Sequence, residues 1–236
     1  MNERKAVIMA GGEGIRLQPL TYAIPKPLLP IGNYTVLEYL IKRLSEHRIT
    51  EIFILTCYQH QKFEICREYG RKYGVTVSLV KEEKKMGTIG GIFQIKEQLT
   101  DSFLIMNADI ITHADLSRMF DQHTSQEAFC TLGVKDYTMK MPYGVVESAG
   151  DKTVTGILEK PEHHYLISAG VNMFSPGVFD FLHGDVVQLP DLVRKGIEAG
   201  RKVAMYPMEG VWLDIGQSHD YEQAVEMLEQ IGNGDV

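Results

Sequence analysis

Residues 9–33 read Met-Ala-Gly-Gly-Glu-Gly-Ile-Arg-Leu-Gln-Pro-Leu-Thr-Tyr-Ala-Ile-Pro-Lys-Pro-Leu-Leu-Pro-Ile-Gly-Asn. This stretch continues the apolar run of residues 6–9, which predicts a buried first strand. Gly11, Gly12 and Gly14 follow that strand and carry no Cβ, so a phosphate group or a base can approach the backbone closely. The stretch therefore predicts a ligand site just beyond the carboxyl end of the first strand.

Two positive charges follow in the same loop. Arg16 offers a planar set of donors and Lys26 a movable point charge, a combination that suits a nucleoside triphosphate. The loop is not a P-loop, because the Gly-Lys-Ser/Thr ending is missing. Pro19 and Pro25 also exclude the long helix that a dinucleotide-binding motif requires. The prolines around Lys26 predict a stiff, shaped loop instead.

The same stretch resembles the N-terminal motif of the sugar-1-phosphate nucleotidyltransferases, also called nucleotide-sugar pyrophosphorylases. That motif is Gly-Gly-x-Gly-x-Arg-Leu-x-Pro-Leu-Thr-x-x-x-Pro-Lys-Pro, and every fixed position is present from Gly11 to Pro27. Weaker matches continue to about residue 221. The resemblance implies an α/β, Rossmann-like fold, the nucleotide-diphospho-sugar transferase fold, with a mostly parallel sheet flanked by helices.

The pattern of the first half agrees with that fold. Thr35 and Glu38 form a capping box ahead of a helix over 36–44, and apolar runs alternate with amphipathic segments. Strands are predicted at 52–55, 75–80 and 103–106, and further helices at 59–72 and 89–99. Such alternation is typical of a mostly parallel sheet with helices on both faces.

The sequence pattern changes near residue 126. Shorter strands are predicted at 128–134, 144–147 and 154–158, followed by helices at 190–199 and 218–230. We interpret residues 1–231 as a single nucleotidyltransferase domain, with a nucleotide-binding core over about 1–125 and 200–231. A small β-rich, sugar-binding lobe spans about 126–199, and 232–236 form a disordered tail.

Composition limits the classes of partner. The chain has 236 residues, a formal net charge of −7 and a pI of about 5.6, which argues against a nucleic-acid surface. No apolar run is long enough for a membrane span, and no signal peptide is expected. Three cysteines without Cys-x-x-Cys spacing indicate free thiols and a cytoplasmic protein.

Two carboxylates are candidate metal ligands. Asp109 follows the predicted strand 103–106, and Asp214 lies in the string Trp212-Leu213-Asp214-Ile215-Gly216. Mg²⁺ takes oxygen ligands, and one or two carboxylates together with substrate phosphates can hold it. Both contexts resemble the magnesium sites of the family, so we expect Mg²⁺ as the cofactor.

The segment Lys81–Gly91 resembles a family string that ends in Leu-Gly-Thr-Ala-Gly and contacts the nucleotide. Gly87 would let the backbone approach the base, Thr88 would cap the helix that follows, and Glu82 would accept hydrogen bonds from guanine. Lys84 and Lys85 read as solvated charges. The resemblance implies one set of nucleotide-binding residues: Ala10, Gly11, Gly12, Gly14, Arg16, Glu82, Gly87, Thr88 and Asn107.

The second half supplies candidates for the sugar phosphate. The resemblance implies that the sugar 1-phosphate contacts Lys26, Gly144, Glu159, Lys160, Ser168 and Gly170. Ser168 departs from the family, in which an Asn occupies this position. Asn172 either faces a pocket or ends an edge strand, and Asp220 reads as a charge in the first turn of a helix.

The resemblance implies that a sugar 1-phosphate attacks the α-phosphorus of an NTP and releases pyrophosphate. Arg16, Lys26 and Asp109 are the expected catalytic residues. Three strings, around Asp109, Gly144 and Asp214, look most like guanylyltransferases for mannose, heptose or glucosamine 1-phosphate, which favours GTP. The product would feed nucleotide-sugar and cell-surface glycan biosynthesis.

Alternatives stay open at this stage. They are cytidylyl or thymidylyl transfer to another sugar 1-phosphate, phosphocholine cytidylyl transfer, and a non-catalytic nucleotide-sensing subunit. A choline pocket would draw on Tyr143, Glu159 and Trp212. A homo-oligomer is compatible with the sequence, which leaves the oligomeric state undecided.

Overall fold

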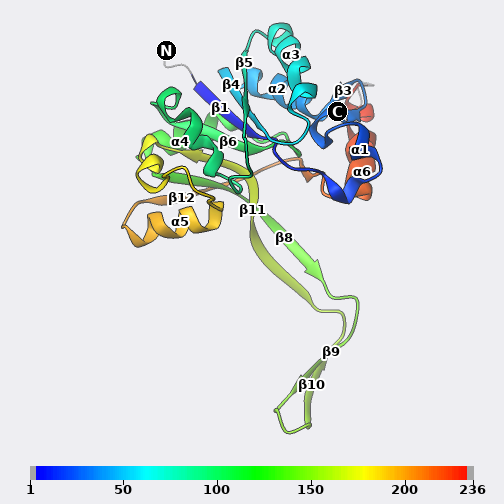
Figure 1. Cartoon of the computed structure of the whole chain (residues 1–236). Coiled ribbons are helices and arrows are strands. Elements are labelled where there is room, and N and C mark those ends of the chain that lie inside the picture. Colours follow the sequence, from blue (N-terminus) through cyan, green and yellow to red (C-terminus); the bar gives the residue numbers. More distant parts are fainter. Residues whose placement is uncertain (1–3, 233–236) are drawn as a thin grey trace.

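A seven-stranded sheet forms the centre of the computed structural model, which describes residues 4–232 (Figure 1). Its strands lie in the order β12-β8-β11-β6-β1-β4-β5. The strands of the sheet are β1 (Arg4–Met9), β4 (Ile49–Thr56), β5 (Thr76–Lys81), β6 (Phe103–Asn107), β8 (Cys130–Lys140), β11 (Glu162–Phe174) and β12 (Val203–Pro207). Three short pairs are separate: β2 (Pro30–Ile31) with β3 (Tyr34–Thr35), β7 (Ile110–Thr112) with β13 (Trp212–Asp214), and β9 (Val145–Ser148) with β10 (Val154–Leu158).

The helices lie mostly between strands. The α-helices are α1 (Leu20–Ala23), α2 (Val36–Glu46), α3 (Ile65–Tyr73), α4 (Leu116–Ser125), α5 (Leu189–Glu198) and α6 (Ser218–Gly232). The 3₁₀ helices are η1 (Ile15–Leu17), η2 (Lys26–Leu28), η3 (His60–Glu64), η4 (Gly90–Gln98) and η5 (Pro176–Phe181). The predicted tail began at residue 232, which is the last residue of α6, and its remainder lies outside the described residues.

The sheet is mostly parallel, as expected. β5, β4, β1 and β6 pair in parallel, and β12 pairs in parallel with β8. Only β11 runs antiparallel to both of its neighbours among these seven strands. The carboxyl ends of β1, β4, β5 and β6 therefore meet at one edge, where α/β sheets bind their ligands.

Helices cover both faces of the sheet. Along β1, Ala6 and Ile8 point into one apolar core with α2, α3, α4 and α6, whereas Val7 points into a second core with η4, η5 and α5. This alternation follows from the period of two along a strand. The two-sided burial explains why the strands read as continuous apolar runs.

Most of the predicted elements are confirmed. Thr35 caps α2, because its hydroxyl oxygen accepts a hydrogen bond from the Glu38 amide at 3.1 Å. The helix predicted over 89–99 is wrong in type. Residues 90–98 form 3₁₀ helix with a break at Ile95, where φ is −119° and ψ is 22°. Two glycines at its start favour this irregular backbone, which sequence periodicity does not reveal.

The β-rich segment differs from a separate lobe. Strand β8 and the carboxyl half of β11 complete the central sheet, and α5 packs on its second face. Only residues 135–167 leave the body, as a long two-stranded ribbon that ends in the β9–β10 hairpin (Figure 1). We call residues 135–167 the arm. The change of sequence pattern near residue 126 therefore corresponds to two things: the arm, and further strands of the central sheet.

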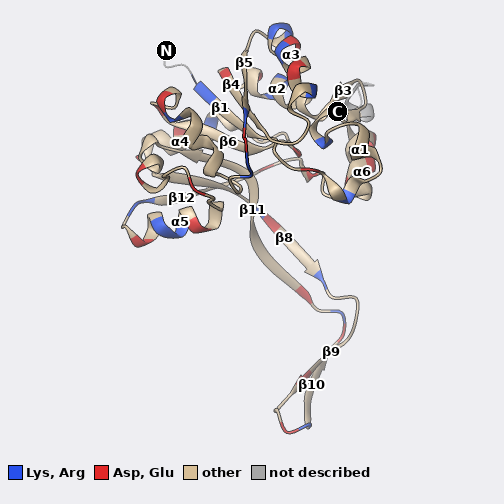
Figure 2. Cartoon of the chain, viewed as in Figure 1, with Lys and Arg blue, Asp and Glu red and all other residues tan. Residues whose placement is uncertain are grey.

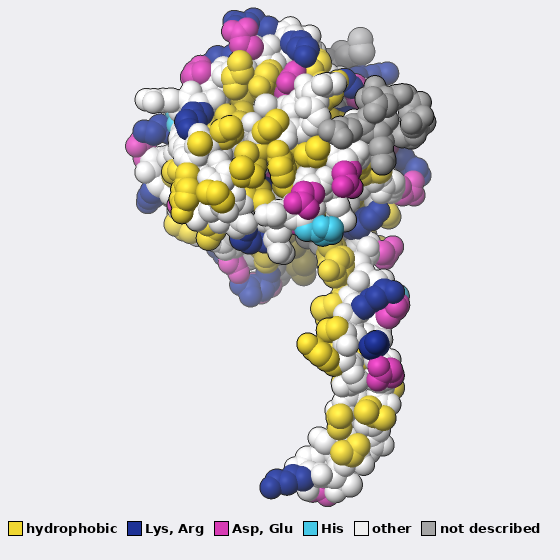
Figure 3. Space-filling view, turned by 90° about the vertical axis from the view of Figure 1, so that its right-hand side faces the viewer, with side chains coloured by type: hydrophobic (Ala, Val, Ile, Leu, Met, Phe, Trp, Pro, Cys, Tyr) yellow, Lys and Arg dark blue, Asp and Glu magenta, His cyan; other side chains and the backbone are white. Residues whose placement is uncertain are grey.

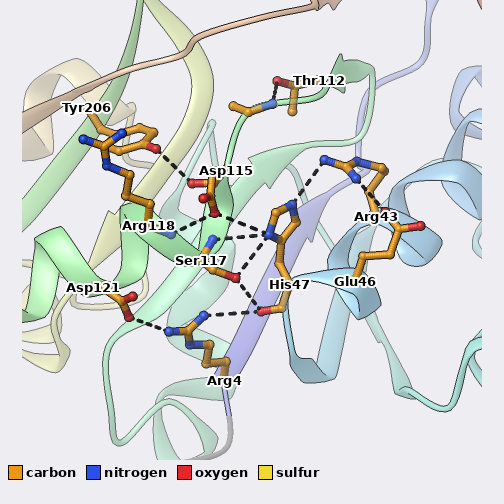
Figure 4. Close-up of polar contacts among 11 residues, drawn as sticks. Arg4, Arg43, Glu46, His47, Thr112, Asp115, Ser117, Arg118, Asp121 and Tyr206 are labelled. Atoms are coloured by element: carbon orange, nitrogen blue, oxygen red, sulfur yellow. Dashed lines mark hydrogen bonds and ion pairs between the residues drawn. The ribbon is translucent and has the colours of Figure 1, made fainter. Parts of the chain in front are cut away.

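A polar network joins elements at the amino end of the sheet (Figure 4). Arg4 donates to the Asp121 carboxylate at 2.6 Å and to the His47 carbonyl at 3.4 Å, while Ser117 Oγ lies 3.2 Å from Nδ1 of His47. Burial, together with the neighbouring Arg43, lowers the pKa of His47. The network fixes α2 and α4 to β1 at the edge opposite the glycine loop, so it serves the scaffold.

Charged residues of both signs occur along α3 and α5 (Figure 2). None of the helices in the described part of the chain combines the length and the apolar character that crossing a bilayer requires.

All three cysteines, Cys57, Cys66 and Cys130, carry free thiols, as predicted.

Candidate active site

Three adjoining cavities open at the carboxyl edge of the parallel strands. The cation cavity, of about 240 Å³, is lined by Met9, Ala10, Gly12, Gly14, Ile15, Arg16, Lys26, Pro27, Ala108, Asp109 and Gly216. The glutamate cavity, of about 440 Å³, is lined by Met9, Gly11, Gly12, Glu82, Lys85, Met86, Gly87, Thr88, Asn107, Val186 and Gln188. The tryptophan cavity, of about 200 Å³, is lined by Thr88, Ile89, Ile105, Asn107, Ile110, Ser168, Ala169, Gly170, Asn172, Leu189, Pro190, Trp212 and Asp214.

These cavities form one continuous site. Met9 and Gly12 line both the cation and the glutamate cavity, and Thr88 and Asn107 line both the glutamate and the tryptophan cavity. Fourteen of the predicted site residues line one or more of these cavities: Ala10, Gly11, Gly12, Gly14, Arg16, Lys26, Glu82, Gly87, Thr88, Asn107, Asp109, Ser168, Gly170 and Asp214. An elongated ligand with a charged end can therefore span all three.

The glycine loop is shaped by its own contacts. Gly14 has φ of +63°, and a Cβ there would lie 3.0 Å from carbon atoms of both Lys26 and Thr21. The Thr21 hydroxyl donates to the Gly14 carbonyl at 2.9 Å. Only glycine tolerates this conformation and this packing, which hold the loop beside Lys26.

Lys26 lies at the floor of the cation cavity and is 9 % exposed. Its ammonium group donates to the carboxylate of Asp109, which follows β6. Arg16 lines the same cavity beside Gly216, since a Cβ at Gly216 would come within 3.3 Å of its Nη1. Two cations from one loop and one carboxylate from a distant part of the chain thus meet beside bare glycine backbone.

Asp214 reaches the same region from β13. That strand pairs with β7, and the amide of Ile215 donates to the Asp109 carbonyl at 3.0 Å, which ties the two acidic segments together. Burial raises the pKa of Asp214, and the charge of Asp109 raises it further, while Lys26 and Arg16 oppose this rise. The raised pKa indicates that the carboxyl groups of Asp109 and Asp214 lie close together and are partly shielded from water.

The donor set around these carboxylates fits a hard cation that substrate also ligates. Among the described residues, no three His, Cys, Asp or Glu side chains form a ready metal cage. Two carboxylates and open space in the adjoining cavities match the mode in which Mg²⁺ takes few protein ligands and keeps phosphates and waters. The site is unsuited to a closed structural metal centre.

Glu82 is the buried acidic group of the glutamate cavity. Its side chain is 5 % exposed, and its Oε1 has no hydrogen-bond partner. Burial raises the pKa of this carboxyl group. A Cβ at Gly11 would lie 2.9 Å from Glu82 Oε2, so the two segments fit only because residue 11 is glycine.

The loop after Glu82 differs from the prediction in two contacts. Thr88 does not cap the following helix; its Oγ1 accepts from the amide of Leu189 at 2.8 Å and so caps α5. Lys85 is not merely solvated, because it lines the glutamate cavity and donates to Glu13 at 2.6 Å. Long-range partners of this kind leave no signal in local sequence.

The tryptophan cavity is built around an irregularity in β11. Ser168 pairs with Val134, but the next paired residue, Asn172, faces Leu132, so the intervening residues bulge from the ladder. The Trp212 indole N–H donates to the Ala169 carbonyl at 2.8 Å. Asn172 is 3 % exposed, lines this cavity and keeps an Oδ1 without a partner. Of the two readings of Asn172, the pocket-facing one is correct.

Gly144, Glu159 and Lys160 are not brought to these cavities. All three lie on the arm, where Gly144 approaches Glu159 (Figure 1). The extended chain between Ser168 and Glu162 alone covers roughly 20 Å at the rise of a β-strand. The same separation divides Trp212 from Tyr143 and Glu159, so these three do not form a cage within one chain.

Asp220 acts as a helix-cap residue. Its carboxylate accepts from the amides of Gly216 at 3.1 Å and Gln217 at 2.7 Å, at the start of α6. This confirms the reading of Asp220 as a first-turn charge. Cavity residues that sequence reasoning missed include Gln188 and Pro190, which arrive from a segment about a hundred residues away from Thr88.

Comparison with known proteins gives a consistent picture. The chain is 31 % identical over 222 residues to the mannose-1-phosphate guanylyltransferase of Mycobacterium tuberculosis, covering 92 % of this chain and 62 % of that protein. It is 29 % identical over 241 residues to the UTP–glucose-1-phosphate uridylyltransferase of Synechocystis sp., covering 94 % and 62 %. The chain thus spans about 62 % of the length of these curated relatives.

Solved structures share the fold. HddC from Yersinia pseudotuberculosis superposes with a TM-score of 0.70 at 21 % identity, covering 95 % of this chain and 99 % of that chain. The model of the family described as nucleotidyl transferase matches residues 5–231. With this match and these relatives, the chain belongs to the sugar-1-phosphate nucleotidyltransferase family.

Proposed function

We propose that the protein transfers a nucleotidyl group from an NTP to a sugar 1-phosphate, with release of pyrophosphate. The observation that carries this proposal is the convergence of Arg16, Lys26 and Asp109 on one cavity lined by bare glycine backbone. Retention of both cations and both carboxylates argues against a non-catalytic nucleotide sensor. The activities that the relatives are named for belong to the same reaction class.

The acceptor phosphate is itself the nucleophile in this reaction. One of its oxygens forms a bond to the α-phosphorus as the bond to the bridging oxygen of pyrophosphate breaks. Lys26 holds the α-phosphate and the incoming phosphate together, and Arg16 binds the β- and γ-phosphates and draws charge toward the leaving group. The protein thus contributes positioning and electrostatic stabilisation, and no covalent enzyme intermediate is needed.

Asp109 and Asp214 are the residues that would hold Mg²⁺. When bound, the ion would withdraw charge from the phosphates. Lys26 donates to the carboxylate of Asp109. That contact keeps the ammonium group beside the carboxylate and ready to turn to phosphate when nucleotide enters.

We propose GTP as the nucleotide. The support is Glu82, a buried carboxyl group with an unpartnered oxygen in the glutamate cavity next to Gly87 and Thr88. Guanine presents a ring N–H and an amino group side by side, which match the two oxygens of a carboxyl group. Asn107 and the segment from Ala10 to Gly12 would line the path from base to phosphates.

The acceptor is proposed to enter the tryptophan cavity, where Ser168, Gly170 and Asn172 offer polar groups. An aminosugar or mannose-like 1-phosphate fits the preference of the related guanylyltransferases. Phosphocholine transfer is disfavoured because the suggested aromatic and acidic cage does not form within one chain. We also propose that the protein works in the cytoplasm, since free thiols persist in reducing compartments.

The test is pyrophosphate release with four NTPs, each combined with mannose, glucosamine, glucose and heptose 1-phosphates and with phosphocholine. We expect release with Mg²⁺, GTP and a sugar 1-phosphate. Release with CTP or dTTP in place of GTP would support cytidylyl or thymidylyl transfer instead. Nucleotide binding without release in any combination would indicate the sensor role.

A further inference from the structure

The arm is a ribbon with two chemically different faces. Tyr137 pairs with Tyr165 and Met139 with His163, so these four side chains share one face. The other face carries paired polar groups. There Lys140 and Glu162 form an ion pair at 2.8 Å, and Thr138 bonds to His164 at 3.1 Å. Figure 3 shows apolar side chains along one side of the upper arm and charged ones along the other.

The apolar residues of the arm have no cover. Ten of the exposed large apolar side chains in the described residues lie between 137 and 166: Tyr137, Met139, Met141, Tyr143, Val146, Val154, Ile157, Leu158, Tyr165 and Leu166. Their exposed fractions run from 37 % for Met141 to 75 % for Tyr143. Such a concentration on a projecting element is typical of an interaction site.

An isolated two-stranded ribbon is marginally stable in water, and it is stabilised when a third surface packs on its apolar face. Its own body does not supply that surface, because the arm points away from it (Figure 1). If each exposed apolar side chain contributes roughly 100 Å², the ten side chains, which lie on both faces of the arm, offer on the order of 1,000 Å² per protomer in all. A partner that covers one face buries only part of this area, so an interface of the standard size, roughly 800 Å² per partner, needs a second surface on the same protomer.

A second group of exposed apolar side chains lies beside the site. Ile15, Leu20, Tyr22 and Ile24 are between 42 % and 65 % exposed, and they come from the loop that carries Arg16. We call these four residues the rim patch. Ile15 also lines the cation cavity, so the rim patch adjoins that cavity.

We infer that the protein forms a two-fold dimer in which the apolar face of each arm packs on the rim patch of the other copy. One chain presents both surfaces, and a two-fold axis satisfies both contacts at once. A second copy of the chain is present wherever the protein is, so the apolar face of the arm can be buried without a different partner.

The dimer also completes the site, a step that rests on the proposed function. The arm carries Gly144, Glu159 and Lys160, which lie far from the cavities of their own chain. Docked on the rim patch, the arm would bring the Lys160 ammonium group to the edge of the other copy's cavities, where the acceptor phosphate enters. Acceptor binding would then depend on residues from two chains.

The first experiment measures the mass of the full chain by light scattering and sedimentation. We expect a dimer. Tyr137→Glu and Tyr22→Glu should each shift the protein toward monomer, because each buries a charge in the contact. The controls Thr138→Glu, on the polar face of the same strand, and Ile65→Glu, an exposed apolar residue outside both surfaces, should remain dimeric. A monomeric wild type, or dimers that resist both variants, would overturn the inference.

The second experiment mixes two dimeric variants. Lys26→Ala keeps its arm but lacks the cation of its cavity, and Lys160→Ala keeps its cavity but lacks the arm lysine. Each alone should be nearly inactive. After subunit exchange, a heterodimer has one complete site, so activity should return to about a quarter of the wild-type value for random pairing.

The outcomes separate the two proposals. A mixture that exchanges subunits but stays inactive means that Lys160 serves its own chain, and cross-subunit completion is then wrong. A wild-type dimer that releases no pyrophosphate under any condition contradicts the proposed function and leaves the arm contact intact, since mass alone reports that contact.

Discussion

Arg16, Lys26 and Asp109 can be tested one at a time. We expect Arg16→Ala, Lys26→Ala and Asp109→Ala each to lower kcat by on the order of 10²–10³, because each removes a charge held in place for the transition state. Pyrophosphate release measures the rate and circular dichroism verifies the fold. Lys195→Ala, an exposed lysine on α5, serves as the control and should behave as wild type. Wild-type rates in all three variants would contradict the assignment.

Glu82 is the residue on which nucleotide choice depends in our proposal. Glu82→Gln keeps the shape but replaces one acceptor oxygen by a donor, so the contact with guanine becomes a clash of donors. We expect GTP affinity to fall roughly tenfold or more, since an unpaired buried polar group costs about 1–3 kcal/mol. Calorimetric titration measures the change, and Glu83→Gln is the adjacent exposed control. Unchanged GTP affinity would mean that this carboxyl group does not contact the base.

Asp214 is a metal ligand in our proposal, and it would make metal binding sensitive to pH. Its pKa is raised by burial and by Asp109, so its carboxylate takes up a proton at a pH above the ordinary range of an aspartate. The charged form that binds metal is therefore lost earlier as the pH falls. We expect Mn²⁺ affinity, measured by EPR in the presence of a non-hydrolysable nucleotide, to decline on acidification at a pH above the ordinary range of an aspartate. In Asp214→Asn, Mn²⁺ should bind more weakly, and this step in the pH profile should disappear.

The positions of these single residues were predictable to different degrees. Arg16, Lys26 and Asp109 follow strands whose carboxyl ends share an edge, so topology alone brings them together once the strands are recognised. The burial of Glu82 and the Lys85–Glu13 pair depend on how distant loops pack. Neither local composition nor spacing carries that information.

Among the elements, the turn at Gly87 is held by tight packing. Gly87 has φ of +84°, and a Cβ there would lie 2.3 Å from the Val187 carbonyl oxygen. Gly74 ends α3 with φ of +69° and has open space around it. We expect Gly74→Ala to cost about 1–2 kcal/mol from backbone strain alone, and Gly87→Ala to cost more and to weaken nucleotide binding.

Urea unfolding of both variants separates strain from steric overlap. A larger loss of stability in Gly87→Ala than in Gly74→Ala supports the close approach of the 186–188 segment to the nucleotide loop. Equal losses of stability would mean that residues 186–188 move aside at no cost in free energy. Gly87 would then be required only for the backbone conformation of the turn.

Elements with strong local signals were predicted well. The capping box at Thr35 and the apolar stripe behind it sufficed for α2, since both act within a few residues. The 3₁₀ helix η4 was missed because tertiary contacts of Gly90 and Gly91 select its backbone. A Cβ at Gly91 would lie 2.2 Å from Glu82 Oε1, a constraint that no periodicity reveals.

At the scale of the whole molecule, stability should fall in mild acid because of His123. This side chain is 1 % exposed, its Nδ1 lies 2.9 Å from the Thr131 hydroxyl, and its Nε2 has no partner. Burial lowers its pKa from 6.5 to about 4. Between these values the unfolded chain binds the proton and the folded chain does not. Stability therefore decreases as the pH falls below about 6.5 and is unaffected by this group above that pH.

The expected contribution of His123 is about 2 kcal/mol lost between pH 7.5 and pH 5. Urea unfolding at both pH values measures the loss in the wild type and in His123→Asn, which should lose less by that amount. His183→Asn, an exposed histidine, is the control and should match the wild type. An equal loss in both variants would assign the acid sensitivity to other groups.

The overall architecture was predictable, whereas the arm was not. Alternating strands and helices specify a parallel sheet with covered faces. Strands β9 and β10 at the tip of the arm were predicted, at 144–147 and 154–158, whereas the long strand pair over 135–140 and 162–167 was not. Their projection from the body depends on pairing between Val134–Lys140 and Glu162–Ser168, which is a non-local choice. A sequence pattern alone places such strands in a lobe as readily as in a ribbon.

The register shift in β11 divides one strand into two independently aligned halves. Residues 162–168 pair with β8 along the arm and at its base, and residues 171–174 pair within the central sheet, while residues 169 and 170 belong to neither ladder. Insertions or deletions confined to this short segment would reshape the wall of the tryptophan cavity and leave both alignments intact. If this cavity takes the acceptor, as we propose, descendants of this chain can diverge in acceptor preference there while they inherit the glycine loop unchanged.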